Sequence, residues 1–306
     1  MRNIPIDITK VAMSFLIIFL HVGNVFSFRE INFIFVNGIC RLGVPFFLIV
    51  SGYYFYNVSD YDKLKVWMFR LLKLYIFWTI IYIPFWFSGV NLSLIVNLFN
   101  GYYVLWYIVG LLFAGILLFL LRNKNDIFIF YLSITLFVIG YIFQLLGNLH
   151  IFSGFWGKLL NFLPLYRNFL FDCFPLLAIG MLINKYGFEK RKISINMVII
   201  SFIFVIIESA FNGFIGNRRL DLLVTSLFFV PIFFIFLFNL NSNSNSNVKK
   251  LSFFASGVYL SQILFLNSFE KIFPEKGWVM FVLVVICSSL FSLFLIKIRR
   301  WIPYII

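Results

Sequence analysis

The sequence predicts an all-α membrane protein, a polytopic bundle of about ten transmembrane helices. Of its 306 residues, 62% are hydrophobic and only 12% are charged, and the mean hydropathy is +1.01. Apolar runs close to the length that crosses a hydrocarbon core of about 30 Å recur from one end of the chain to the other. Because these runs are continuously apolar and do not alternate with period two, we expect helices and not a barrel.

The expected spans are apolar runs separated by clusters of charge. A short basic lead introduces the first run, basic residues at 63–73 introduce the third, and a pair at 122–124 divides the fourth from the fifth. Basic residues at 185–192 divide the sixth run from the seventh, and those at 297–300 follow the tenth. The ten spans are residues 8–28, 35–57, 71–89, 104–121, 127–146, 168–183, 193–213, 220–240, 251–270 and 277–296.

The loops between these spans are too short to form a soluble domain. We therefore expect residues 1–306 to form a single transmembrane domain. The polar run NSNSNSN, residues 241–247, predicts a flexible linker between two spans.

The distribution of lysine and arginine predicts the orientation. If the N-terminus is cytoplasmic, 17 of the 25 Lys and Arg residues lie on the cytoplasmic side, which leaves 8 for the spans and the outer side. We therefore expect both termini in the cytoplasm and a multi-pass protein of the bacterial cell membrane. The net charge of +14 is then explained by topology and by anionic lipid of the inner leaflet, so no nucleic-acid partner is expected.

The three cysteines, Cys40, Cys173 and Cys287, lie in or beside apolar runs. Their odd number and their positions predict neither a disulfide framework nor a metal cluster, and no metal is expected.

The stretch KVAMSFLIIFLH, residues 10–21, carries polar residues at helical spacing. His21 is eleven positions after Lys10, and eleven steps of 100° rotate by three turns plus 20°, so both side chains leave the same face, ~16 Å apart along the axis. Asp7, Ser14 and Asn24 lie on that face too. We expect this polar seam to face the bundle interior, because an ionisable group in the bilayer needs a partner or a wet cavity. It would reach about two-thirds of the way across the membrane. A plainer interpretation is that His21 only hydrogen-bonds a neighbouring helix.

The second informative stretch is RLGVPFFLIVSGYYFY, residues 41–56. Pro45 interrupts helical hydrogen bonding, and the small pair Ser51 and Gly52 predicts a kink or a close contact between helices. For Ser51 and Gly52, packing and function both stay open. Arg41, expected at the outer end of its span, is a candidate to hold an anion or a carboxylate.

Later spans carry further polar or aromatic positions. Trp106 and Tyr107 suit either a substrate site or an interfacial aromatic belt. Arg167 and Asp172 are five residues apart, so they do not stack on one helix face. Glu208 is a carboxylate inside a span, which by default marks a functional cavity or an ion pair.

Two remaining features have plainer interpretations. Gln262 interrupts an apolar run and suits either substrate contact or a hydrogen bond between helices. Arg218, Arg219 and Asp221 are expected in an outer loop, exposed to solvent.

These stretches, in this order, resemble the acyltransferase 3 family of multispan membrane enzymes. The resemblance covers most of the chain and rests first on a basic residue, ten residues and then His, followed by RLGVPFFLIVSGYYFY. LWYIVG at 105–110, YRNFLF at 166–171 and FASGVYLSQ at 254–262 support it. Within the family the chain is similar to the membrane domain of the vancomycin-resistance serine racemases. It departs by having Lys10 where the family usually has Arg, and Gln262 where many members have His.

The resemblance implies transfer of an acyl group, often acetyl, from a cytoplasmic coenzyme A thioester to a hydroxyl of an outer glycan or lipid-linked saccharide. Acyl-CoA, the saccharide acceptor and membrane lipid are then the expected partners, and the oligomeric state is left open. His21 would act as general base or be acylated in passing, Lys10 would attract the donor's phosphates, and Arg41 or Ser51 would stabilise the oxyanion. The residues expected to contact substrate are Ser14, Asn24, Ser51, Trp106, Tyr107, Arg167, Asp172, Glu208 and Gln262.

A membrane transporter of serine or another small polar substrate is the alternative. The polar seam, the interrupted second span and the buried carboxylate suit a transporter as well. Against it, the sequence shows no paired short or interrupted spans in matching halves and no internal repeat.

Overall fold

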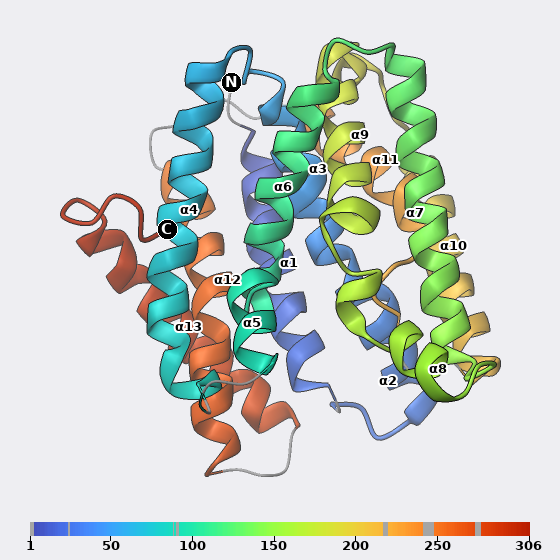
Figure 1. Cartoon of the computed structure of the whole chain (residues 1–306). Helices are drawn as coiled ribbons and strands as arrows, with labels where there is room; N and C mark the ends of the chain where they lie inside the picture. Colours follow the sequence, from blue (N-terminus) through green and yellow to red (C-terminus); the bar gives the residue numbers. More distant parts are fainter. Residues whose placement is uncertain are drawn as a thin grey trace.

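The computed structural model describes residues 3–23, 25–87, 89, 92–216, 220–240, 248–272 and 277–306, and within this part its regular secondary structure is helical (Figure 1). The helices are α1 (Ile4–Val22), α2 (Arg29–Ile34), α3 (Gly43–Phe55), α4 (Tyr61–Trp86), α5 (Leu92–Phe99), α6 (Trp106–Leu121), α7 (Asp126–Asn148), α8 (Gly154–Leu160), α9 (Phe174–Lys185), α10 (Ile195–Phe214), α11 (Ser226–Asn239), α12 (Val248–Glu270) and α13 (Trp278–Ile298). Asn24, Arg218, Arg219 and the linker at 241–247 lie outside the described residues.

The structure confirms an all-α membrane bundle. In the described part, 8 helical stretches are long and apolar enough to cross a membrane. The predicted spans 168–183 and 220–240 correspond to shorter helices, α9 with the turn before it and the 14-residue α11. Each of the ten predicted spans therefore coincides with a helix.

Capping residues move two boundaries away from their predicted places. The helix α1 begins at Ile4 because the Asn3 side chain accepts a hydrogen bond from the Ile6 N–H at 3.3 Å, with Pro5 in the first turn. It ends at Val22, before Gly23 with φ 83°, so its last turn contains His21. His21 is thus closer to the end of its helix than the predicted span 8–28 placed it.

The helix α4 begins ten residues before the predicted span. Asp60 caps it by accepting the Lys63 N–H at 2.9 Å, and this hydrogen bond lowers the pKa of Asp60 below its usual value. The stabilisation that the Asp60 cap contributes is fully present above the ordinary pKa of an aspartate. It is lost as the pH falls through the lowered pKa of Asp60.

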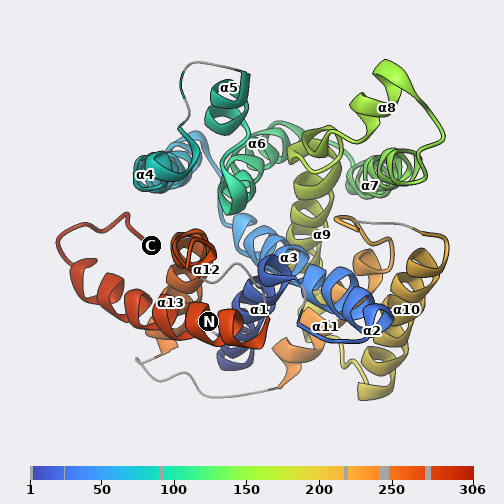
Figure 2. The ribbon, with the colours of Figure 1, turned by 90° about the horizontal axis from the view of Figure 1, so that it is seen from below.

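The buried side chains form two groups, and the helices that carry them lie on two sides of the bundle (Figure 2). One group lies mainly among α3, α6, α7, α9, α10 and α11, and the other mainly among α1, α4, α12 and α13. The helices α1 and α3 contact each other near the middle, so polar groups on them lie between the two halves.

Glycines allow α3 and α9 to pack backbone against backbone. A Cβ at Gly52 would collide with the Leu177 carbonyl oxygen, and a Cβ at Gly180 would collide with the Ile49 carbonyl oxygen. The two contacts are reciprocal, which is how small residues bring membrane helices close together. The packing interpretation of Gly52 is confirmed.

Irregular helical turns lead directly into α3 and α9, and in each case a proline follows in the first turn of the α-helix. The two stretches with these irregular turns are here called the interrupted helices. The π-helix η1 (Phe35–Ile39) and the 3₁₀-helix η2 (Cys40–Leu42) precede α3, which contains Pro45. The π-helix η5 (Phe169–Cys173) precedes α9, which contains Pro175. The sequence did not reveal these irregular turns, because a π-helix leaves no gap in an apolar run.

The loops that join α3 to α4, α6 to α7 and α9 to α10 lie at one end of the bundle, the upper end in Figure 1. These loops and the adjoining first turns carry Lys63, Arg122, Lys124, Lys190, Arg191 and Lys192, so this end is here called the basic end. Contacts tie the helix ends together there: Lys185 Nζ lies 2.7 Å from an Asp126 carboxylate oxygen, and Arg122 donates to the Val58 carbonyl at 2.8 Å. The chain after α13 folds back against α4, where the Trp78 indole N–H donates to the Ile305 carbonyl at 2.9 Å.

Candidate functional site

A small cavity of ≈ 30 Å³, here called the His21 cavity, lies between α1 and the two interrupted helices. Polar and aromatic side chains from six separate segments line it. These are His21, Arg41, Trp106, Arg167, Asp172, Asp221 and Tyr259. The structure thus brings together five residues that the sequence singled out: His21, Arg41, Trp106, Arg167 and Asp172.

The helix interruptions explain why Arg41 and Asp172 reach this cavity. Arg41 lies in the 3₁₀-helix between η1 and α3, and Asp172 lies in the π-helix before α9. Irregular helical turns of this kind change the direction of side chains and are frequent at functional sites. They also bring Arg167 and Asp172, which would not share a face of a regular helix, to the wall of one cavity.

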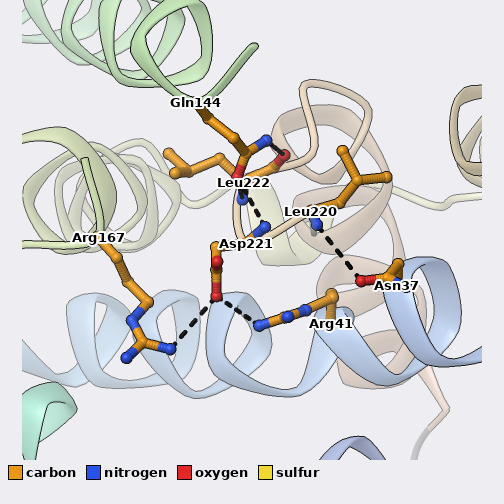
Figure 3. A network of polar contacts seen from close by, with 7 residues as sticks. All are labelled: Asn37, Arg41, Gln144, Arg167, Leu220, Asp221 and Leu222. Atoms are coloured by element: carbon orange, nitrogen blue, oxygen red, sulfur yellow. Dashed lines mark hydrogen bonds and ion pairs between the residues drawn. The ribbon is translucent and has the colours of Figure 1, made fainter. Parts of the chain in front are cut away.

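Asp221 lies between the two arginines (Figure 3). Its Oδ1 accepts a hydrogen bond from Arg41 Nη1 at 2.5 Å and another from Arg167 Nη1 at 3.3 Å. The Asp221 side chain is only 2% exposed, and those of Arg41 and Arg167 are 16% and 21% exposed. The prediction that Asp221 is a solvent-exposed loop residue was wrong.

A buried glutamine on α7 holds Asp221 in place. Gln144 Oε1 accepts the backbone N–H groups of Asp221 at 2.7 Å and Leu222 at 2.9 Å, and Gln144 Nε2 donates to the Leu222 carbonyl at 2.9 Å (Figure 3). Asn37 accepts the Leu220 N–H at 3.3 Å. The loop that follows α10 is therefore drawn into the bundle by two amides, and it carries its carboxylate inward.

Two guanidinium groups and two carboxyl groups line the His21 cavity. The Nε atoms of Arg41 and Arg167 are buried and have no hydrogen-bond partner in the described part of the chain. Arg167 also lies over the Trp106 ring, 4.9 Å from its centroid. Each arginine thus retains donor capacity beyond its pairing with Asp221.

His21 is half-buried at the end of α1, with its ring 5.4 Å from that of Tyr103 in an edge-to-face arrangement. A histidine in this position is suited to accept a proton during a reaction.

A larger cavity of ≈ 490 Å³, here called the Lys10 cavity, lies among α1, α3, α4, α6 and α12. Its polar lining includes Asp7, Lys10, Ser51, Arg70 and Tyr107. Lys10 Nζ lies 2.8 Å from Asp7 Oδ1 and donates to Ser252 Oγ at 3.3 Å. The predicted seam on α1 does face the interior, since Asp7 is buried and Lys10 and His21 line cavities.

Three aromatic rings, here called the septum, lie where the two cavities meet. Tyr259 lines both cavities, and its ring centroid is 5.7 Å from that of Tyr107 and 5.8 Å from that of Phe47. The Tyr259 hydroxyl donates to the Val104 carbonyl at 2.9 Å, and the hydroxyls of Tyr107 and Ser51 are 3.2 Å apart. Lys10 and His21 therefore lie on one helix, in cavities separated by these rings.

Three other predicted site residues lie away from both cavity linings. Ser14 is fully buried and donates to the Val11 carbonyl of its own helix at 2.7 Å. The Glu208 carboxylate accepts the Val224 and Thr225 N–H groups at 2.9 and 2.8 Å, so it supports the segment before α11. Gln262 donates to the Tyr259 carbonyl at 3.0 Å, next to the septum.

Several lining residues were not among the sequence candidates: Asp221, Tyr259, Phe47 and Arg70. Tyr259 lies in the FASGVYLSQ stretch, which offered a signal. Arg70 lies among the basic residues at 63–73, which served only to predict the orientation in the membrane. Phe47 lies in the informative stretch 41–56, two positions after Pro45, but its apolar ring gave no reason to select it as a site residue.

Residues 3–297 match the model of a family described as an acyltransferase domain. A serine/alanine racemase of Enterococcus gallinarum is 29% identical over 239 residues, which cover 70% of this chain and 34% of the racemase. The chain thus spans about a third of the length of this curated relative. No solved structure matches the chain.

Proposed function

The chain belongs to this acyltransferase family, and from that premise we propose that it is an integral membrane O-acyltransferase. It would move an acyl group, acetyl in the first instance, from cytoplasmic acyl-CoA to a hydroxyl of an extracytoplasmic glycan or lipid-linked saccharide. The observation that carries the proposal is the pair of cavities that meet at Tyr259, with Lys10 in one and His21 in the other. Because the charged donor cannot cross the bilayer, donor and acceptor must reach the reaction centre from opposite sides, and two cavities that meet allow this.

The Lys10 cavity is the proposed donor site. Its volume of ≈ 490 Å³ lies within the range of pockets that hold a ligand of moderate size. Lys10 and Arg70 supply positive charge for the phosphates of the donor, and both belong to the basic end of the bundle. The thioester would then extend past Ser51 and Tyr107 toward the septum.

His21 is the proposed general base. It takes the proton of the acceptor hydroxyl while the hydroxyl oxygen attacks the thioester carbonyl carbon. A new carbon–oxygen bond forms, the carbon–sulfur bond breaks, and the proton returns to the leaving thiolate. The products are the acyl ester and free coenzyme A.

Arg41 and Arg167 are the proposed donors to the oxyanion that develops on the carbonyl oxygen. Their shared contact with Asp221 fixes both guanidinium groups, and their buried Nε groups retain donor capacity. The same positions suit a negatively charged group on the saccharide acceptor. Trp106 and Asp172 lie in the same wall, where a sugar ring and its hydroxyl groups would bind.

Replacement of the base tests the proposal. A deletion strain restored with wild type, His21→Ala or His150→Ala is compared for ester-linked acyl groups on its surface glycans by mass spectrometry. We expect ester to be lost with His21→Ala and kept with His150→Ala, because His150 is exposed after α7. Wild-type ester content in a His21→Ala strain that retains the protein in its membrane would contradict the assignment.

Transport of serine or another small polar substrate remains the second candidate, and one observation favours it. Irregular turns precede both α3 and α9, which pack together, and irregular helix segments form substrate sites in many transporters. Uptake of radiolabelled serine by the same strains separates the two candidates. Uptake that depends on Arg41, with unchanged ester content, would support transport.

A further inference from the structure

We propose that the septum of Phe47, Tyr107 and Tyr259 selects short acyl groups, with Phe47 as the residue that sets the length limit. This inference rests on the proposed acyltransferase function and specifies its donor. It concerns which acyl-CoA the protein accepts.

The geometry of a thioester leads to this inference. The pantetheine arm of the donor ends at sulfur, and the acyl chain lies beyond the carbonyl carbon. If coenzyme A occupies the Lys10 cavity and the carbonyl reaches His21, the acyl chain must pass the septum and lie on the His21 side. The space that the acyl chain needs is therefore on the far side of the rings.

The space on that side is small. The His21 cavity measures ≈ 30 Å³, whereas a single water molecule needs about 10–15 Å³. Apolar side chains, Ile17, Leu20 and Val44, line it together with the charged groups. A space of this size suits an acyl group as small as acetyl. Each further methylene would require the rings or these side chains to move.

Of the three septum residues, Phe47 can be truncated to widen the septum without breaking a hydrogen bond. Tyr259 is held by the Val104 carbonyl, and Tyr107 is paired with Ser51, so truncating either would also break a hydrogen bond. Phe47 has only ring contacts with these two tyrosines, at 6.4 and 5.8 Å between centroids. Its replacement by a smaller residue creates space between the two cavities without leaving a polar group unpaired.

The test measures donor preference in permeabilised membranes that contain the full chain and its native acceptor. Acetyl-CoA, butyryl-CoA and octanoyl-CoA, each labelled in the acyl carbonyl, are supplied in turn, and label in alkali-labile ester is counted. The variants are Phe47→Ala, Phe47→Leu and, as a matched control, Phe55→Ala, which lines the same cavity outside the septum. His21→Ala membranes give the background.

We expect wild type to prefer acetyl-CoA and Phe47→Ala to raise the ratio of butyryl to acetyl transfer by roughly tenfold or more, since one methylene in a tight pocket changes transfer by about 10–200-fold. Phe47→Leu should raise the ratio less, and Phe55→Ala should leave it at the wild-type value. Equal transfer of octanoyl and acetyl groups by wild type would overturn the inference, even if both Phe47 variants were inactive. So would an unchanged ratio in an active Phe47 variant. Absence of ester label above the His21→Ala background with all three donors would instead overturn the proposed function.

Discussion

Arg41 Nη1 lies 2.5 Å from Asp221 Oδ1, although 180 positions separate the two residues in the sequence. The carboxylate is almost completely buried, and it also accepts from Arg167. Ion pairs in a medium of low dielectric constant depend strongly on each partner, because an unpaired charge cannot be hydrated there. Asp221 therefore orients both arginines of the His21 cavity.

Asp221→Asn should destabilise the protein by about 3–5 kcal/mol, the usual effect of removing one partner of a buried ion pair. Activity should fall as well, because the two guanidinium groups lose their common acceptor. The measurement is the thermal unfolding temperature in detergent, together with ester formation. Asp60→Asn is the control, since Asp60 pairs with Lys63 at an exposed site. Equal unfolding temperatures for wild type and Asp221→Asn would disprove this account of the pair.

Gln144→Leu should have a related effect through the backbone of residues 221 and 222. Each buried peptide group left without its partner should cost about 1–3 kcal/mol. Because Gln144 acts through Asp221, the double variant Gln144→Leu with Asp221→Asn should lose less activity than the sum of the single losses. Strictly additive losses would show that the two residues act independently.

Lys10 should affect donor binding more than the chemical step. Lys10→Gln together with Asp7→Asn removes the charge without leaving the buried carboxylate unpaired. We expect the KM for acyl-CoA to rise about tenfold, which is about 1.4 kcal/mol, while kcat changes little. Lys10→Arg should retain most of the affinity because it keeps the charge. Lys63→Gln at the exposed start of α4 is the control, and an equal increase in KM there would indicate general charge attraction.

Gly52→Ala should weaken the contact between α3 and α9. The new methyl group would meet the Leu177 carbonyl, which is backbone and cannot rotate away, so we expect a loss of about 1–3 kcal/mol. Unfolding temperature and the yield of protein in the membrane are the measurements. Gly277→Ala should be neutral, since its Cβ would meet no described atom within 4 Å. A wild-type unfolding temperature for Gly52→Ala would contradict the close packing.

Composition and periodicity predicted the bundle, the ten spans and the inward orientation of the seam, because these depend on local runs of residues. The sequence did not predict the two interrupted helices as a pair, since the π-helix at 169–173 contains only residues that also suit a regular helix. Asp221 was misplaced for another reason. A carboxylate between two spans looks solvated, and only the amides of Gln144 and Asn37, from distant helices, bring it inward.

The candidate site was predicted in part. Polar or aromatic residues stand out within apolar runs of the sequence, and this identified five residues of the His21 cavity: His21, Arg41, Trp106, Arg167 and Asp172. Of the three septum residues, only Tyr107 was a predicted site residue. The septum as a unit was not predicted, because its rings come from three helices and only the fold brings them together.

The septum also bears on the energy supply of the cell. The Lys10 and His21 cavities are polar and meet inside the membrane. Without an apolar barrier between them, they would form a water-filled path through which protons leak. The three rings of the septum pack edge to face or tilted against one another, and we expect them to exclude a continuous row of water molecules while no substrate is bound. Widening them with Phe47→Ala should therefore dissipate the proton gradient as well as admit longer chains, so natural variation at this position is expected to be limited by leakage before it is limited by catalysis.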